Sequence, residues 1–406
     1  MAKVPPIPLT EAQARLLALA DPLTVEHVDI EGSVGRYLAE DLQARRTQPA
    51  ADLSAMDGYA VRADDLAGPW RVIGESAAGH PHEGALASGE AVRIATGALL
   101  PRDGNVVLLQ EDIARDGETI RFTGELPSPV DKHIRRCGMD FELDSMVLAA
   151  GTRIGPAQAA LAIAAGHKHL PVRRRPQVAV MDSGDELAAD PELCALHQIP
   201  ASNSQMLAAM ARSLPVDAKR LGPVPDTMDA LAQAFAEASD SDLVVTSGGA
   251  SVGDHDLIKP ALEAWGAKLD FWRVAIKPGK PILVATRDLP MRRQVIIGLP
   301  GNPVSSFVTA HLFVLPLLRA MLGAARPLPA RIRTRLGAPV PANGPRQEFR
   351  RALWDGEVVV PVSEQDSAAL AALASSNVLI DRPANAPAAA AGEDVWCYPL
   401  ENGGIA

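Results

Sequence analysis

The sequence predicts a multidomain protein that combines an α/β domain, built on a parallel sheet, with domains made largely of strands. Between residues 176 and 325, runs rich in Val and Ile alternate with helical patterns of about 10–15 residues. Short β-type runs separated by Gly and Pro fill residues 47–144 and recur after residue 326. The length of 406 residues is enough for two to four domains, each with its own core.

The first helix is expected over residues 9–20, where Thr10 and Gln13 form a candidate capping box. A second helix is expected to begin at Pro156, because proline is favoured in the first helical turn. Between the two helices, glycines and prolines interrupt the chain every few residues. This texture predicts a small all-β module over residues 47–144.

The α/β alternation becomes regular after residue 176. Strands are predicted at 177–181, 216–221, 243–246 and 295–297, and helices at 202–212, 226–238, 254–265 and 304–318. Ser202 or Asn203 is expected to cap the first of these helices, and Asp226 the second. After a linker at 324–330, short strands at 331–336, 348–354 and 358–362 predict a final β domain.

Composition excludes several classes of protein. The net charge is −10 and there is no long basic run, so nucleic acid is not expected as a partner. The three cysteines lack CxxC spacing, which suggests neither a zinc site nor a disulfide framework. The longest apolar stretch, 304–318, contains His311 and Pro316 and is expected to be a core helix rather than a membrane span. With no signal-like N-terminus, a cytoplasmic location is expected.

Two loops of small residues carry the strongest chemical signal. They are Thr246–Asp256 and Gly298–Ser306, and each follows an apolar strand and precedes a helical pattern. Glycine-rich turns at helix N-termini present backbone N–H groups to anions, so the pair predicts a site for a phosphorylated ligand. The first loop also contains Asp254 and Asp256, carboxylates that a phosphate tolerates when a cation bridges them.

Other clusters have both a chemical and a plain structural interpretation. Asp57 and Thr96 lie in turns, and Asx-turns or Thr-Gly turns explain them equally well. Asp140 ends a short basic run that is also typical of a solvated surface. Glu186 follows a strand end, where α/β proteins place ligand crevices, although acids also stabilise helix N-termini.

A stiff loop carries Lys277 and Lys280 among two prolines and a glycine, which limits where the lysines can point. His255 is expected to be a first-turn helix residue rather than a metal ligand, because no second histidine lies at a ligand spacing.

Taken in order, these segments resemble the molybdopterin molybdenumtransferase family, which includes bacterial MoeA and the E-domains of plant and animal molybdenum-insertion proteins. The resemblance extends from Thr10 to about Tyr398. The matching motifs are Ser54–Ala60, Arg93–Gly97, Arg135–Asp140, Ser183–Leu187, Thr246–Asp256, Ala275–Pro281 and Gly298–Ser306.

The resemblance implies four parts. An elongated helical and strand domain is formed by 1–46 and 145–175, and a β domain is inserted at 47–144. A molybdopterin-binding α/β domain covers 176–325, and a C-terminal β-barrel-like domain covers 326–406. Members of the family are head-to-tail homodimers that place the active site between the α/β domain of one subunit and the inserted β domain of the other.

The implied activity is insertion of molybdate into adenylylated molybdopterin with magnesium-dependent release of AMP. Partners implied beyond the homodimer are the adenylyltransferase and recipient molybdoenzymes. The catalytic residues implied are Asp57, Thr96, Asp140, Glu186, Asp226 and Asp256, of which Glu186, Asp226 and Asp256 also hold Mg²⁺. The pterin and pyrophosphate residues implied are Ser247, Gly248, Gly249, Ser251, Gly253, Pro300, Gly301, Asn302, Pro303 and Ser305. Molybdate, a dianion, is assigned to Lys277, Lys280 and Arg351.

Two departures from the family pattern affect this assignment. Asp182 adds a charge before the Ser183–Leu187 motif, and Ala371–Ala372 stand where the family often has a serine pair. Two alternatives also remain. A molybdopterin adenylyltransferase shares the α/β fold, but its loop usually reads Gly-Gly-Thr-Gly and it has no role for the extra β domains. A non-catalytic scaffold of the same fold is the other.

Overall fold

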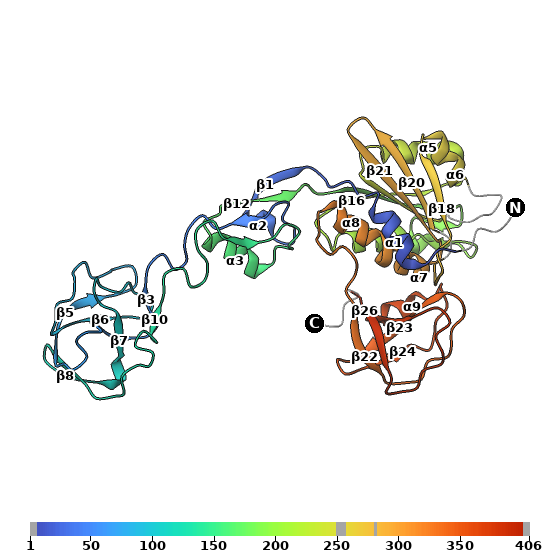
Figure 1. The fold of residues 1–406 in the computed structure, drawn as a ribbon. Coiled ribbons are helices and arrows are strands. Elements are labelled where there is room, and N and C mark those ends of the chain that lie inside the picture. The colour runs from blue at the N-terminus through green and yellow to red at the C-terminus, as the bar shows by residue number, and fades with distance from the viewer. Residues whose placement is uncertain (1–5, 249–256, 280–281, 401–406) are drawn as a thin grey trace.

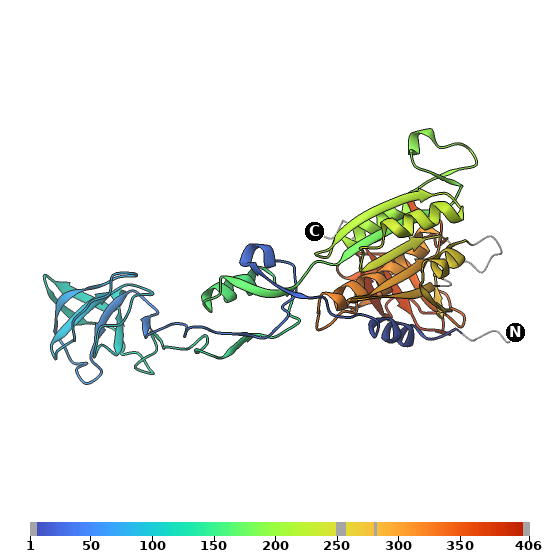
Figure 2. The ribbon, with the colours of Figure 1, turned by 90° about the horizontal axis from the view of Figure 1, so that it is seen from above.

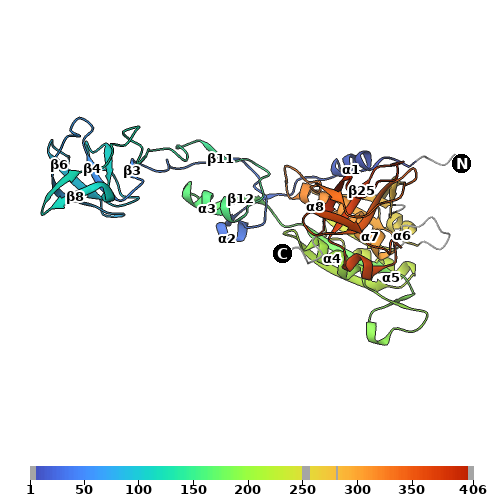
Figure 3. The same cartoon turned by 90° about the horizontal axis from the view of Figure 1, so that it is seen from below.

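The computed structural model describes residues 6–248, 257–279 and 282–400, and for 270–272 it describes the backbone alone. The chain is elongated (Figure 1). An α/β domain and a small barrel lie together at one end, a narrow arm extends from them, and a second β domain lies at the far end. Figure 3 shows the same separation from below, with the far β domain clear of the α/β domain.

The arm contains both flanks of the inserted β domain. Strands β1 (Val25–Asp29) and β12 (His169–Arg173) pair antiparallel, as do β2 (Leu42–Gln43) and β11 (Met146–Leu148). Helices α2 (Ile30–Ser33) and α3 (Pro156–Ala164) cover a small core that includes Leu38, Ile154 and Leu170. The helix predicted to begin at Pro156 therefore does so.

The far β domain is a six-stranded sheet in the order β7-β4-β6-β5-β9-β8. These strands are β4 (Gly58–Val61), β5 (Trp70–Ser76), β6 (Glu90–Ile94), β7 (Val106–Leu109), β8 (Ile113–Asp116) and β9 (Thr119–Phe122), with the 3-10 turn η1 (Gln110–Asp112) between β7 and β8. A pair, β3 (Leu53–Ser54) and β10 (Ile134–Arg135), connects it to the arm. Its core is centred on Trp70, which is 1% exposed.

The α/β domain has a six-stranded sheet in the order β16-β13-β17-β21-β20-β18. Neighbours among β16 (Asp217–Val224), β13 (Gln177–Ser183), β17 (Leu243–Ser247) and β21 (Arg292–Leu299) are parallel, as predicted. By contrast, β20 (Ile282–Leu289) pairs antiparallel with β21, because a tight hairpin links the two strands. The edge strand β18 (Lys268–Trp272) in turn pairs antiparallel with β20.

Helices cover both faces of this sheet. Helix α4 (Asn203–Ala211) and the long helix Pro303–Met321 pack on the face that includes Val178 and Val180. Helices α5 (Met228–Glu237) and α6 (Ile258–Ala264) pack on the face that includes Ala179 and Met181. At the edge of the domain, β14 (Leu187–Ala188) and β15 (Ile199–Pro200) flank a projecting excursion that contains η2 (Pro191–Leu193) (Figure 2).

The long helix consists of α7 (Pro303–Thr309), a π-helical turn η3 (Ala310–Val314) and α8 (Leu315–Met321). Its length and composition would suit a membrane span, but 89% of its most apolar window is buried inside the fold. It is therefore a core helix, as the sequence indicated.

Helix α1 (Leu9–Leu17) packs against this core helix. The expected capping box is wrong: Pro8 precedes the helix without a side-chain cap, and Gln13 instead donates to the carbonyl of Leu312 at 2.9 Å. A buried amide finds its partner across the domain, which local spacing cannot show.

The C-terminal domain is a closed barrel of five strands in the cyclic order β23-β24-β22-β26-β25. The strands are β22 (Ile332–Leu336), β23 (Gln347–Trp354), β24 (Val358–Pro361), β25 (Val378–Arg382) and β26 (Asp394–Pro399), with α9 (Leu370–Ala374) beside them. A sixth strand, β19 (Ile276–Lys277), reaches from the α/β domain and pairs parallel with β23. The two domains are thus joined by backbone hydrogen bonds.

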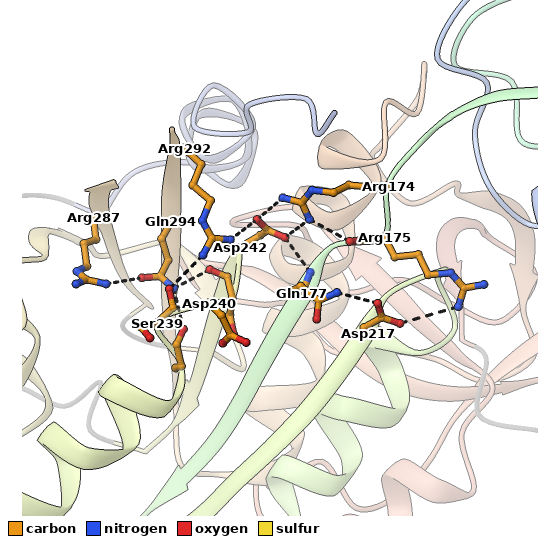
Figure 4. A network of polar contacts seen from close by, with 12 residues as sticks. Arg174, Arg175, Gln177, Asp217, Ser239, Asp240, Asp242, Arg287, Arg292 and Gln294 are labelled. Carbon is orange, nitrogen blue, oxygen red and sulfur yellow. Dashed lines mark hydrogen bonds and ion pairs between the residues drawn. The ribbon is translucent and has the colours of Figure 1, made fainter. Parts of the chain in front are cut away.

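A polar network closes the amino-terminal edge of the α/β sheet (Figure 4). The side chain of Asp242 is only 3% exposed. It accepts hydrogen bonds from Arg174 at 2.7 Å and from Arg292 at 2.8 Å. The backbone N–H of Gln177 also donates to it at 2.9 Å. This network fixes the edge opposite the strand ends that carry the two glycine-rich loops.

Candidate functional site

The two glycine-rich loops meet at the carboxyl edge of the sheet. β17 and β21 are adjacent and parallel, with Ser247 opposite Leu299, so the loops that follow them begin side by side. β13 is the other neighbour of β17, with Asp182 opposite Ser247, and the Ser183–Leu187 motif starts at its end. The structure thus brings three predicted motifs to one edge, where α/β proteins place their ligands.

Gly248, at the start of the first loop, packs closely against the backbone of the two neighbouring strands, β13 and β21. Its φ is +94°, and a Cβ there would lie 2.8 Å from the carbonyl oxygen of Ser183. Its N–H donates to the carbonyl of Leu299 at 3.2 Å. Only glycine fits this backbone, because both the conformation and the contact exclude a side chain. The remaining predicted residues of this loop, Gly249, Ser251, Gly253 and Asp256, lie outside the described residues.

Hydrogen bonds from helix α7 and to the barrel domain fix the second loop. The hydroxyl of Ser306 donates to the carbonyl of Pro300. Asn302 donates to the hydroxyl of Ser367 at 2.9 Å, and the N–H of Val304 donates to the carbonyl of Ser367 at 3.1 Å. Because Ser367 belongs to the barrel domain, that domain helps to set the shape of the loop. Gly301 and Asn302 are exposed, whereas Ser305 is buried and Pro303 begins α7.

Asn203 is a site residue that sequence reasoning missed. It was expected only as a helix cap, yet its side-chain nitrogen donates to Ser247 at 2.8 Å and to the carbonyl of Gly301 at 2.7 Å. The N-terminus of α4 is instead bound by Asp182, which accepts from the N–H of Ser204 at 2.9 Å. An Asn before a helix reads as a cap in any sequence, so nothing local distinguishes this role.

Carboxylates gather beside Ser183. The Ser183 hydroxyl donates a hydrogen bond to the exposed carboxylate of Asp226 at 2.7 Å. The expectation that Asp226 caps the next helix is wrong, because Thr227 accepts from the N–H of Ala230 and performs that role. Glu186 is also exposed and folds over Gly184, where a Cβ would lie 2.6 Å from its Oε2.

These carboxylates suit a hard cation, since oxygen ligands are what Mg²⁺ prefers. Within the described ranges, no group of three His, Cys, Asp or Glu residues is close enough together to hold a metal. The third predicted ligand, Asp256, lies outside those ranges. The binding of magnesium by Glu186 and Asp226 therefore stays a prediction, which needs ligands beyond the described residues.

Lys277 lies where the barrel meets the α/β domain. Its ammonium is 2.8 Å from Glu348 Oε1, and Arg350 approaches the same oxygen at 3.4 Å. The Lys277 side chain is 56% exposed, so it can reach a ligand, while that of Glu348 is 8% exposed. Lys280 lies outside the described residues.

Arg351 is buried rather than presented to solvent. Its guanidinium donates to the carbonyls of Glu364 at 3.0 Å, Asp366 at 2.9 Å and Ala369 at 3.3 Å. Burial lowers the pKa of this side chain, although Glu364 and Asp366 oppose the shift. In this arrangement Arg351 fixes the segment that presents Ser367, and contact with molybdate stays a prediction that requires this segment to move.

Asp57 and Thr96 are brought together in the far β domain. The carboxylate of Asp57 accepts from both the N–H of Thr96, at 2.7 Å, and its hydroxyl, at 2.8 Å. These two hydrogen bonds hold the pKa of the exposed Asp57 carboxyl below its usual value. The turn also needs Gly58, where a Cβ would lie 1.9 Å from the carbonyl oxygen of Leu108. The pair is a preorganised, anionic surface feature.

Asp140 lies elsewhere, on the segment that returns to the arm, and its N–H donates to the carbonyl of Gln48 at 3.1 Å. Apart from Asp140 and the buried Arg351, the predicted site residues that the structure describes form two groups. The Asp57–Thr96 pair is in the far β domain, and the loops, carboxylates and Lys277 are at the other end of the chain (Figure 1). One chain does not bring the two groups together.

A cavity of about 500 Å³ lies apart from both groups. It is formed by α4, the core helix and the linker to the barrel, and none of the predicted site residues lines it. Its walls include Met206, Met210, Phe307, His311, Leu315 and Arg319.

Comparison with known families gives three matches along the chain. Residues 7–166 match the MoeA N-terminal region (domains I and II). Residues 179–320 match a probable molybdopterin binding domain, and residues 333–400 match the MoeA C-terminal region (domain IV).

Individual relatives agree with this. The molybdopterin molybdenumtransferase of Haemophilus influenzae is 37% identical over 321 residues, covering 78% of each chain. That of Staphylococcus aureus strain Mu50 is 31% identical over 402 residues, covering 96% of this chain and 94% of its own. The crystal structure of the molybdopterin biosynthesis MoeA protein from Pyrococcus horikoshii OT3 superposes with a TM-score of 0.84 at 26% identity, covering 98% of this chain and 100% of its own.

Proposed function

The chain belongs to the molybdopterin molybdenumtransferase family, and on that premise we propose that it inserts molybdate into adenylylated molybdopterin and releases AMP. The proposal places the enzyme in the cytoplasm, receiving its substrate from an adenylyltransferase and passing its product to molybdoenzymes. The observation that carries the proposal is that the two glycine-rich loops begin at the same sheet edge as Ser183, whose hydroxyl binds the Asp226 carboxylate.

In this proposal the loops bind the pyrophosphate of the substrate. Gly248 and Gly301 leave backbone close to the ligand, because neither has a side chain to shield it. Backbone N–H groups at these positions would donate to the phosphate oxygens. Ser247 and Asn302 are already held by hydrogen bonds to neighbours, so these two residues need little reorganisation when substrate binds.

Magnesium, when bound, neutralises the phosphate charge as the phosphoanhydride is cleaved. Glu186 and Asp226 would hold it, together with Asp256. Ser183 fixes the orientation of Asp226 through a 2.7 Å hydrogen bond, which leaves its second carboxylate oxygen for the cation.

Molybdate is proposed to bind beside Lys277 and Lys280. Lys277 is exposed enough to meet a dianion, yet it is anchored by Glu348 at the barrel. A fixed cation of this kind stabilises an oxyanion more than a freely moving one does, because less side-chain entropy is lost on binding.

The complete site is proposed to form in a homodimer. Asp57 and Thr96 are preorganised but remote from the loops of their own chain, so a second copy would supply them. Closed twofold assembly gives each dimer two such composite sites.

The assignment of the loops is tested by a matched pair of glycine variants. Gly248→Ala places a Cβ 2.8 Å from the Ser183 carbonyl at a φ of +94°, whereas Gly266→Ala has a φ of +87° but meets nothing within 4 Å. Both variants carry backbone strain, of the order of 1 kcal/mol. Gly248→Ala is expected to lose molybdate-dependent AMP release, and Gly266→Ala to retain it. Equal activity in the two variants would contradict the assignment.

A further inference from the structure

Asn203 connects the two glycine-rich loops while belonging to neither. One side-chain nitrogen donates to Ser247 Oγ at 2.8 Å and to the Gly301 carbonyl at 2.7 Å. Both N–H bonds of a single planar amide are used. The distance between the loops is therefore tied to the geometry of one rigid group.

The amide is itself held in place by the fold. Asn203 is the first residue of α4, and the next residue, Ser204, donates its N–H to Asp182 at 2.9 Å. Asp182 is 1% exposed and lies on β13, the central neighbour of β17. Leu207 and Ala208 of the same helix are buried in the domain core. A sheet strand and a packed helix thus set the position from which Asn203 reaches the loops.

Among the residues that the structure describes, the other contacts between the loops are longer or lie deeper. The hydroxyls of Ser247 and Ser306 are 3.5 Å apart, and the N–H of Gly248 meets the Leu299 carbonyl at 3.2 Å. The contacts of Asn203 are shorter than both. Without them, the exposed tip at Gly301 would depend on contacts of its neighbours, which are the hydrogen bond from Ser306 to the Pro300 carbonyl and those from Asn302 and Val304 to Ser367 in the barrel domain.

We propose that Asn203 is a positioning residue that sets the spacing of the two loops for the phosphate end of the pterin substrate. This inference rests on the proposed function, since it takes the loops as the pterin site. Asn203 acts through Ser247 and Gly301 and takes no part in bond breaking.

Two substitutions test it. Asn203→Ala removes both hydrogen bonds, and Asn203→Asp keeps the shape but turns a carboxylate oxygen toward the Gly301 carbonyl, which repels it. We expect the dissociation constant of molybdopterin, measured anaerobically, to rise at least about tenfold in Asn203→Ala, the equivalent of about 1.4 kcal/mol. The rise should be larger in Asn203→Asp. In turnover, KM for adenylylated molybdopterin should rise more than kcat falls.

Gln205→Ala is the matched control. Gln205 lies on the same helix but is exposed and accepts a hydrogen bond from Arg220, so its loss should leave pterin affinity unchanged. A double-mutant cycle adds a second measurement. If Asn203 acts through Ser247, then Asn203→Ala should cost less affinity in a Ser247→Ala background than in the wild-type chain.

Wild-type affinity in both Asn203 variants would overturn the inference, as would fully additive effects with Ser247→Ala. Failure of the wild-type chain to bind molybdopterin would instead contradict the proposed function. The two failures are therefore distinguishable.

Discussion

Lys277 and Glu348 form a 2.8 Å ion pair across the boundary between the α/β domain and the barrel. The pairing is set by register, because β19 lies parallel to β23 with Lys277 opposite Glu348. Arg350 approaches the same carboxylate oxygen at 3.4 Å. A carboxylate beside the proposed molybdate site weakens the field of the lysine toward an anion, and this has a measurable consequence.

Glu348→Gln should tighten molybdate binding, because the amide oxygen can still hold Lys277 by a hydrogen bond but no longer competes for it as an anion. The expected gain is about threefold in dissociation constant, the scale of a partly exposed ion pair. Isothermal titration with molybdate at low ionic strength measures it. Glu357→Gln, an equal charge change at an exposed position of the barrel, should have no effect. Weaker molybdate binding in Glu348→Gln would contradict this interpretation of the pair.

Lys277→Ala and Lys280→Ala should weaken molybdate use and leave pterin binding nearly intact. The lysines are assigned to the oxyanion, while the glycine-rich loops are assigned to the pyrophosphate. The test is the molybdate concentration needed for half-maximal AMP release, with molybdopterin affinity measured in parallel. Loss of pterin affinity with unchanged molybdate dependence would reverse the two assignments.

Asp242→Asn should destabilise the α/β domain by about 1.5–3 kcal/mol, because Arg174 and Arg292 would lose charged hydrogen bonds but are themselves partly exposed to water. Burial favours a raised pKa for Asp242, but hydrogen bonds from Arg174, Gln177 and Arg292 outweigh it and leave the pKa lowered. The carboxylate therefore stabilises the fold above its unfolded pKa, and this contribution is lost as pH falls through the lower folded pKa.

Urea unfolding at a series of pH values checks this. The difference between wild type and Asp242→Asn should be full near pH 7 and should shrink below about pH 4. Asp217→Asn is the control at the same sheet edge, because Asp217 and Arg175 are each 51% exposed and 4.0 Å apart. That variant should change stability by less than about 1 kcal/mol. A pH-independent difference for Asp242→Asn would show that its charge is not the stabilising feature.

Local patterns pointed to one part of the candidate site. The strand-loop-helix signal pointed to the loops of Gly248 and Gly301, which do begin side by side at one sheet edge. Asp57 and Thr96 came from the family resemblance, since turn chemistry alone left them as ordinary turn residues, and they hydrogen-bond each other. What sequence could not show was the partner of a side chain when that partner is distant. Asn203 was interpreted as a cap although it spans two loops. Arg351 was assigned to molybdate, and its hydrogen bonds to carbonyls inside the barrel domain could not be seen in the sequence.

The same limit explains the smaller errors. A hydrogen-bonding side chain near a helix start can bind its own helix or a group across the core, and spacing favours the local choice. Gln13 and Asp226 both took the distant option. The antiparallel β20 was missed because a hairpin between two buried strands leaves the same apolar runs as a crossover.

Each complete site is proposed to take residues from two chains, and mixed dimers provide the sharpest experiment. Asp57→Ala and Glu186→Ala disable opposite halves of the composite site, so each homodimer should be nearly inactive in molybdate- and magnesium-dependent AMP release. Co-refolded or co-expressed in equal amounts, half of the dimers would be mixed and would hold one intact site of two. The mixed sample is therefore expected to recover about a quarter of wild-type activity. No recovery in mixed dimers of confirmed composition, or full activity in a monomer, would contradict this proposal.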